Sequence, residues 1–223
     1  DGVCVMQAHS VGMFRAKKQI TEALKKIYGN SLKAVYDKSS GTAPYKAGLE
    51  LVDGYMYRSE DFSDDEQIVQ ENGHKFIVNW TEGQKTGFFL DQKYNRLAVQ
   101  KLCKDAKVLD CFTHTGSFAL NAGIAGAGSV LGVDASELAV EQARKNAELN
   151  GLSDTVKFQC ADVFELLPEL ERVGEQYDVV ILDPPAFTKS RNSVKNAVRG
   201  YREINIRGLK LVKDGGYLCT CSC

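Results

Sequence analysis

Residues 107–118 read KVLDCFTHTGSF, an apolar run that passes through a short turn into a helical pattern. This pattern predicts a strand over 107–112 and a helix over 117–125. Apolar runs and amphipathic segments then alternate along the rest of the chain. The expected strands are 129–134, 155–160, 178–183 and 216–222, and the expected helices are 136–150, 163–172 and 195–212. Apolar strands that alternate with helices indicate parallel βαβ units, so we expect an α/β fold built on a parallel sheet.

The chain before this region has a less regular pattern. A helix is expected over 14–28 and strands over 32–36 and 75–80, with a segment rich in turn residues and acids at 41–65. We therefore expect two domains, a small N-terminal α/β subdomain and a larger one, at 1–82 and 83–223.

The composition is that of a globular protein, with 43% hydrophobic and 26% charged residues. No long uncharged apolar run is present, so we expect no membrane span, and residues 1–10 lack the layout of a signal peptide. A net charge of −1 lacks the basic excess of a dedicated nucleic-acid-binding domain. The seven cysteines are odd in number and scattered, which fits reduced cytosolic thiols better than disulfides, so we expect a cytoplasmic protein. The closing Cys219-x-Cys221-x-Cys223 lacks a second pair of ligands, so we expect no metal site.

Acidic residues stand at the ends of three successive predicted strands, at Asp110, Asp134 and Asp162. Ligands of a parallel α/β sheet bind beyond the carboxyl ends of its strands, so these side chains are candidates for binding. Asp134 would accept the hydroxyls of a ribose, and Asp162 the amino group of an adenine. The alternative is that the three residues only cap the helices that follow them. The first turn holds one glycine, Gly116, and lacks the G-x-G-x-x-G spacing that a diphosphate needs, which disfavours a nicotinamide-dependent oxidoreductase.

This arrangement resembles the class I methyltransferases, whose sheet is Rossmann-like and whose cofactor is S-adenosyl-L-methionine. The resemblance covers residues 84–223 at least, and its motifs are the run Asp110–Gly116, Asp134, and Asp162-Val163. It implies that these motifs hold the methionine end, the ribose and the adenine of the cofactor, in that order. The implied cofactor-binding residues are Asp110, Phe112, Thr115, Gly116, Asp134, Ala135, Asp162, Val163, Asp183, Pro184, Lys85 and Asp91.

The fourth predicted strand ends in Asp183-Pro184-Pro185-Ala186-Phe187. Two prolines stiffen this loop and fix the direction of Asp183. Methyltransferases of amino groups often carry an aromatic residue directly after the prolines, where the ring stacks on the target base. Here Ala186 takes that position and Phe187 follows, which weakens an amino-group interpretation.

The last predicted strand carries three cysteines, and Cys223 lies nearest its carboxyl end. A thiolate at this position could add to carbon 6 of a cytosine and make carbon 5 nucleophilic, with Asp183 beside the base. The base would have to leave its stack to reach such a pocket. The alternative is a buried structural thiol, which is common.

The chain is similar over most of its length to the methyltransferase I family of large-subunit ribosomal RNA, which are cytosine-5 methyltransferases. The residues that carry the similarity are 83–92, Asn95-Arg96, Asp110-Cys111-Phe112, Asp183–Phe187, Arg199-Gly200-Tyr201 and Ser222-Cys223. The similarity implies that Cys223 is the nucleophile. In a sheet with the strand order 3-2-1-4-5, which we expect here, Cys223 would lie beside Asp183, the second catalytic candidate. It also implies a PUA-type RNA-binding domain before Asp1 and a further part of the sheet after Cys223. Cys221 departs from the family pattern, in which a larger apolar residue is usual.

Several alternatives stay open. A methyltransferase of guanine or adenine nitrogen is one, and a related guanine-N7 family shares Asp-Pro-Pro but lacks the cysteine, so Cys223 discriminates between them. A non-catalytic RNA-binding module is another. Lys189 and Arg191 either contact phosphate or belong to a solvated face. Lys85 and Asp91 either cover the cofactor or lie in a hairpin between subdomains. The expected partners are RNA, with large-subunit ribosomal RNA favoured, and a second copy of the chain in a homodimer.

Overall fold

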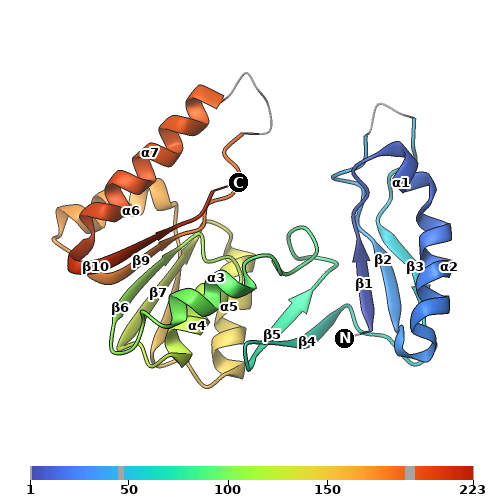
Figure 1. Cartoon of the computed structure of the whole chain (residues 1–223), viewed down its shortest axis with the longest axis horizontal. Helices are drawn as coiled ribbons and strands as arrows, with labels where there is room; N and C mark the ends of the chain where they lie inside the picture. Colours follow the sequence, from blue (N-terminus) through green and yellow to red (C-terminus); the bar gives the residue numbers. More distant parts are fainter. Residues whose placement is uncertain (1, 45–47, 189–193, 223) are drawn as a thin grey trace. The chain divides into compact units, whose positions relative to one another are not determined.

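The computed structural model describes residues 2–44, 48–188 and 194–222, which form two compact units (Figure 1). One unit comprises Asp1–Val69 and Ile77–Phe89, and the other comprises Gln70–Phe76 and Leu90–Cys223. The chain changes unit within a β-hairpin of β4 (Glu66–Glu71) and β5 (His74–Asn79). Asn72 and Gly73 both have positive φ, as a tight hairpin turn requires. The expected domain boundary, between residues 82 and 83, stays a prediction.

The smaller unit is built on a three-stranded sheet, in which β2 pairs in parallel with β1 and antiparallel with β3. Its strands and helices are β1 (Val3–Met6), α1 (Val11–Arg15), α2 (Lys17–Tyr28), the 3-10 helix η1 (Gly29–Ser31), β2 (Ala34–Asp37) and β3 (Gly54–Arg58). Ala34, Phe62 and Trp80 form one core cluster, and Trp80 Nε1 donates to Tyr55 Oη over 3.1 Å. The unit therefore has a core of its own.

The larger unit is built on a five-stranded parallel sheet in the order β10-β9-β6-β7-β8. Its strands are β6 (Lys107–Cys111), β7 (Ser129–Asp134), β8 (Val156–Cys160), β9 (Tyr177–Leu182) and β10 (Val212–Thr220). The order confirms the predicted 3-2-1-4-5 arrangement and the Rossmann-like α/β class. Leu109, Val180 and Ile181 are fully buried in the two central strands, which explains why these strands are apolar without alternation.

Helices cover both faces of this sheet (Figure 1). They are α3 (Lys93–Gln100), α4 (Ser117–Ile124), α5 (Glu137–Leu149), α6 (Val163–Arg172) and α7 (Val194–Lys210). The first three pack together through α4, and the last two pack on each other. Ser136 caps α5 by accepting from Ala139 N over 3.3 Å, as the sequence predicts. None of the helices in the described ranges is both long enough and apolar enough to span a bilayer.

The sequence patterns do not predict β1, β3, β4, α3 or the short η1, and the single helix expected over 14–28 is divided into α1 and α2. β1 has only four residues, and β3 lies inside the segment rich in turn residues. α3 has no apolar stripe, because its one buried side chain is that of Arg96. β10 spans 212–220 rather than 216–222, and its pairing with β9 is irregular between Val212 and Tyr217. Gly215 and Gly216 lie in that interval, and paired glycines are typical of a turn, so the first residues of β10 were not predicted as a strand.

Candidate active site at the carboxyl ends of the strands

The turn after β6, from Phe112 to Gly116, has an unusual backbone. Phe112, His114 and Gly116 have φ of 63°, 51° and 85°. Positive φ is costly for residues other than glycine, and such strain persists where the fold holds it, often at ligand sites. Asn146, fully buried on α5, donates from Nδ2 to the carbonyl of Thr115 over 3.0 Å. The surrounding fold therefore fixes this turn in a shape that is common in binding loops.

Asp110 is buried beneath this turn and keeps one oxygen without a partner. Its Oδ2 accepts from Thr113 Oγ1 over 2.5 Å and from Ala119 N over 2.9 Å, whereas Oδ1 has no hydrogen-bond partner among the described residues. Burial raises the pKa of Asp110 to about 7, and the carboxylates of Asp183 and Asp134 add to the rise. A buried acceptor without a partner costs free energy, which a bound cationic donor would offset.

Asp134 ends β7, and backbone donors orient its carboxylate. Oδ2 accepts from His114 N over 2.9 Å and Oδ1 from Ser136 N over 3.0 Å. Each oxygen keeps a second lone pair, so Asp134 can also accept from the two hydroxyls of a ribose. Asp162 is the N-cap of α6, and its Oδ1 accepts from Phe164 N over 2.8 Å. Capping therefore accounts for Asp162 in the structure, and its contact with an adenine stays a prediction.

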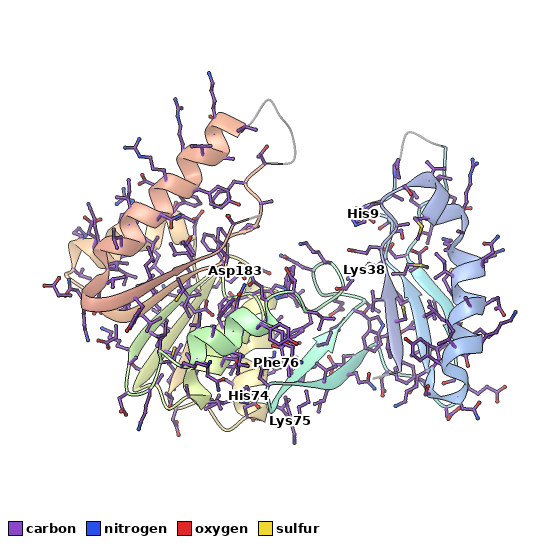
Figure 2. All side chains as sticks on the ribbon, in the orientation of Figure 1. His9, Lys38, His74, Lys75, Phe76 and Asp183 are labelled. Carbon is purple, nitrogen blue, oxygen red and sulfur yellow. The ribbon has the colours of Figure 1, made fainter. Side chains whose placement is uncertain are left out.

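Asp183 follows β9 at the same edge of the sheet (Figure 2). Thr220 of β10 pairs with Leu182, and Cys221 N donates to Leu182 O over 2.8 Å, so Cys221 comes beside Asp183. Gln92 Nε2 donates to Asp183 Oδ1 over 3.0 Å. Burial raises the pKa of Asp183, and the hydrogen bond from the thiol of Cys221 opposes this. Burial and the charge of Asp183 raise the pKa of Cys221 to about 11, so this thiol is protonated at neutral pH.

Phe187, which follows the two prolines and Ala186, packs among other rings. Its centroid lies 4.6 Å from that of Tyr201, 5.6 Å from that of Phe164 and 6.3 Å from that of Phe112. A Cβ on Gly200 would lie 3.1 Å from the same ring, which gives a physical reason for glycine there. Phe187 therefore ties the loop after β9 to α6, α7 and the first turn.

The predicted site residues fall into three groups. Asp110, Asp134 and Asp183 meet at one edge of the sheet, since both other carboxylates raise the pKa of Asp110. Asp91 is near enough to Asp183 to raise its pKa. Among the remaining candidates, Ala135 and Asp162 are exposed, Pro184 and Thr115 are buried, and Val163 belongs to the core.

The structure does not place the other two groups of predicted residues at the carboxyl ends of the strands. Lys85 belongs to the smaller unit, where its Nζ lies 4.7 Å from the centroid of Phe89 and its φ is 47°. Cys223, Lys189 and Arg191 lie outside the described residues. Their roles stay predictions.

Sequence reasoning missed three residues at the site, which are Gln92, Asn146 and Cys221. Gln92 stands in the quoted run 83–92, but α3 was not predicted, so the direction of its side chain could not be inferred. Asn146 lies on a predicted helix and gave no signal beyond a polar residue on the inner face. Cys221 was noted in the sequence only as a departure from the family pattern, whereas its sulfur lies beside the Asp183 carboxylate.

The donors and acceptors at this edge fit S-adenosylmethionine. The free Oδ1 of Asp110 suits an ammonium group, and Asp134 suits a ribose diol. Together they complement a cationic amino-acid nucleoside better than a diphosphate, which two carboxylates would repel. Within the ranges that the structure describes, no three His, Cys, Asp or Glu side chains are grouped as metal ligands.

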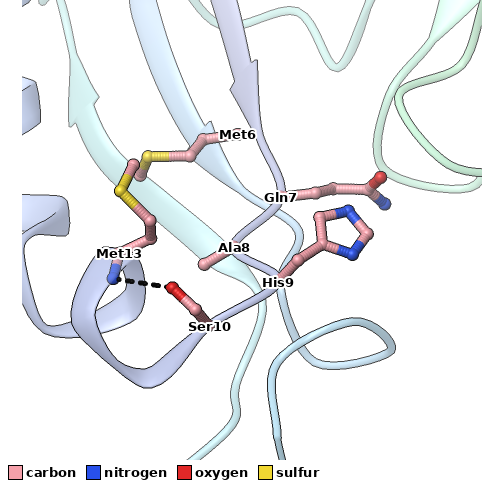
Figure 3. A pocket seen from close by; sticks show the side chains of 6 residues that line it. All are labelled: Met6, Gln7, Ala8, His9, Ser10 and Met13. Atoms are coloured by element: carbon pink, nitrogen blue, oxygen red, sulfur yellow. Dashed lines mark hydrogen bonds between the residues drawn. The ribbon is translucent and has the colours of Figure 1, made fainter.

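The smaller unit carries a separate hollow of about 240 Å³ (Figure 3). Its lining consists of Met6, Gln7, Ala8, His9, Ser10 and Met13. Ser10 Oγ is engaged as the N-cap of α1, where it accepts from Met13 N over 3.3 Å. The hollow is mostly apolar and shares no residue with the site at the strand ends.

Comparisons with known proteins agree with this geometry. Residues 55–223 match the sequence profile of a family described as S-adenosylmethionine-dependent methyltransferase. The chain is 40% identical over 220 residues to the ribosomal RNA large subunit methyltransferase I of Aeromonas salmonicida, a match that covers 98% of this chain and 54% of that protein. The corresponding protein of Cronobacter sakazakii is 36% identical over the same shares. The chain thus spans about half the length of the curated relatives it matches.

Solved structures share the fold at lower sequence identity. A candidate methyltransferase complexed with SAH superposes with a TM-score of 0.83 at 22% identity, over 99% of this chain and 55% of that one. A SAM-dependent methyltransferase from Agrobacterium tumefaciens superposes with a TM-score of 0.71 at 21% identity, over 89% and 61% of the two chains. These likenesses concern the fold.

Proposed function

The chain belongs to the S-adenosylmethionine-dependent methyltransferase family, and on this basis we propose that it methylates carbon 5 of a cytosine in large-subunit ribosomal RNA. The observation that supports this most is the meeting of two strand ends. Asp183 directly follows β9, and Cys221, which follows the neighbouring β10, lies beside it. A carboxylate and a thiol at adjacent strand ends can flank one flipped base.

The proposed chemistry uses both groups. The sulfur of Cys223 forms a bond to carbon 6 of the cytosine, which gives carbon 5 the electron density to attack a methyl group. S-adenosylmethionine supplies that methyl group as an electrophile. A base then removes the proton from carbon 5, the carbon–sulfur bond breaks, and the thiolate is released. Asp183 accepts a hydrogen bond from the polar edge of the base and orients it for the attack.

The relatives support ribosomal RNA as the substrate, because two proteins at 36–40% identity carry names of large-subunit ribosomal RNA methyltransferases. RNA affinity would come from a PUA-type domain outside this chain, since the net charge of −1 offers no general basic surface. A homodimer and a cytoplasmic location complete the proposal.

Methylation of guanine or adenine nitrogen is the alternative reaction. It would use the ring after Asp-Pro-Pro as a platform for the base, but Phe187 already packs against Tyr201, Phe164 and Phe112. The packing of this ring favours the cytosine reaction. A non-catalytic RNA-binding module would have no use for the strained turn and the unpaired Asp110 oxygen.

Replacing Asp134 by alanine is expected to weaken S-adenosylmethionine binding about ten- to a hundredfold. The reason is the loss of charge-assisted hydrogen bonds to the ribose, worth roughly 1.5–3 kcal/mol. Titration calorimetry on the folded variant measures this. Asp154→Ala is the matched control, because that exposed aspartate precedes β8 at the other end of the sheet. Equal affinities in the two variants would contradict the placement of the ribose.

The proposed function is tested by the identity of the product. The full-length protein is incubated with unmodified ribosomal RNA and S-adenosylmethionine, and the nucleosides are analysed by mass spectrometry. We expect 5-methylcytidine in the large-subunit RNA. A methylated guanosine or adenosine in its place would rule the cytosine reaction out.

A further inference from the structure

Gln92 stands at the N-terminus of α3, but its side chain does not cap the helix. It contacts three other side chains instead, one of which is the thiol of Cys221. Asn95 Nδ2 donates to Gln92 Oε1 over 2.6 Å, and Gln92 Nε2 donates to Asp183 Oδ1 over 3.0 Å. The side chain of Gln92 thus binds the carboxylate of the Asp-Pro-Pro loop and does not stabilise the helix end, which suggests a role at the site.

We propose that Gln92 is a positioning residue of the methyl-transfer reaction, which holds the Asp183 carboxylate charged and oriented toward the target base, with Asn95 fixing the Gln92 amide. The inference rests on the proposed function, because it assigns to Asp183 the role of orienting that base. It adds a residue of α3 to the site.

The Asp183 carboxylate determines which end of the Gln92 amide faces it, because an ionised carboxylate only accepts hydrogen bonds. An amide has an oxygen acceptor at one end and a nitrogen donor at the other. The nitrogen end therefore points to Asp183, and Asn95 supports this orientation by donating to the oxygen end. A turned amide would place its oxygen against the carboxylate, where two acceptors repel, and would lose both hydrogen bonds.

A buried ion pair holds the start of α3 in place. Arg96, one turn after Gln92, is 1% exposed and binds Glu71 at the end of β4 through two hydrogen bonds of 2.6 and 2.8 Å. The backbones of Arg96 and Gln92 are also joined, because Arg96 N donates to Gln92 O over 2.9 Å. Gln92 therefore presents its amide from a fixed backbone, as a positioning residue requires.

The charges around Asp183 make the Gln92 donor important. Burial raises the pKa of Asp183, and the negative charge of Asp91 does the same. The hydrogen bonds from Cys221 and Gln92 and the positive charge of Arg96 oppose the rise. Asp110 is also close enough for the charge of Asp183 to raise its pKa. Without the Gln92 donor, the carboxyl group takes up a proton more readily and presents a less defined acceptor to the base.

The test is Gln92→Glu, which keeps the shape of the side chain and replaces the donor by an acceptor. We expect kcat at neutral pH to fall about tenfold, the usual effect of one lost hydrogen bond to a charged group. We also expect the acidic limb of the kcat profile to move to higher pH, because a raised Asp183 pKa leaves less of the ionised form. The S-adenosylmethionine affinity should stay unchanged. Asn95→Ala should produce a smaller change in the same direction.

Gln100→Glu is the matched control, since it makes the same chemical change at the other end of α3. It should leave the pH profile as it is in the unmodified protein. An unmoved acidic limb in both Gln92→Glu and Asn95→Ala would overturn the proposal, as would a loss of cofactor affinity with normal kcat at saturation. The product nucleoside is identified in the same assay. A failure of the cytosine proposal would therefore appear as a different nucleoside, separate from the pH result.

Discussion

Replacing Cys223 by alanine is expected to abolish methylation of RNA, with a loss of at least about a thousandfold in kcat. Carbon 5 of a cytosine is a poor nucleophile, and the proposed bond between the thiolate and carbon 6 is what activates it. The alanine variant should bind S-adenosylmethionine almost normally, because none of the predicted cofactor contacts comes from β10 or the residues after it. Single-turnover methylation and calorimetry together measure the two effects.

Cys219→Ala is the matched control for this variant. Cys219 lies within β10, where it pairs with Ile181, and burial raises the pKa of its thiol. It should retain activity, since its position is within the sheet. Methylation at a normal rate by Cys223→Ala would mean that another group is the nucleophile or that the product is not 5-methylcytosine.

Replacing Glu71 by alanine is expected to lower the free energy of unfolding by about 3–5 kcal/mol. The carboxylate of Glu71 and the guanidinium of Arg96 are 5% and 1% exposed and are joined by two hydrogen bonds. Removal of one partner leaves the other charge buried without compensation, which is far more costly than the loss of a surface pair. Chemical denaturation followed by circular dichroism measures the difference.

An exposed pair provides the control for this experiment. The side chains of Glu22 and Lys25 are 63% and 40% exposed, and Glu22 Oε1 lies 3.1 Å from Lys25 Nζ. Glu22→Ala should therefore change the free energy of unfolding by less than about 1 kcal/mol. The double variant Glu71→Leu, Arg96→Met should recover much of the loss, because it removes both charges. If Glu71→Ala were no more harmful than Glu22→Ala, the ion pair would not anchor α3.

The larger unit could be predicted from the sequence because its strands are buried on both faces. Their runs, such as Val179 to Leu182, are apolar without interruption and therefore easy to recognise. The smaller unit was harder, since β1 has four residues and β3 lies among turn residues. α3 was missed for a different reason, which is that Arg96 takes the buried position where an apolar residue would signal a helix.

The sequence predicted the acidic residues of the site, but it did not predict the side chains that orient them. Strand-end aspartates are visible in a sequence because topology alone brings them to one edge. The partners of these acids depend on side-chain directions from other elements, as for Gln92 on α3 and Asn146 on α5. Cys221 shows the same limit, since its place beside Asp183 follows from the pairing of β10 with β9.

The most direct test of the central claim is covalent trapping with 5-fluorocytosine. RNA that carries this base is incubated with the full-length protein and S-adenosylmethionine, and the peptides of the protein are then mapped by mass spectrometry. Fluorine at carbon 5 blocks the final removal of a proton, so the carbon–sulfur bond cannot break. We predict a methylated RNA adduct on Cys223. Methylation of normal RNA without any adduct on the fluorinated RNA, or an adduct on a different residue, would contradict the account.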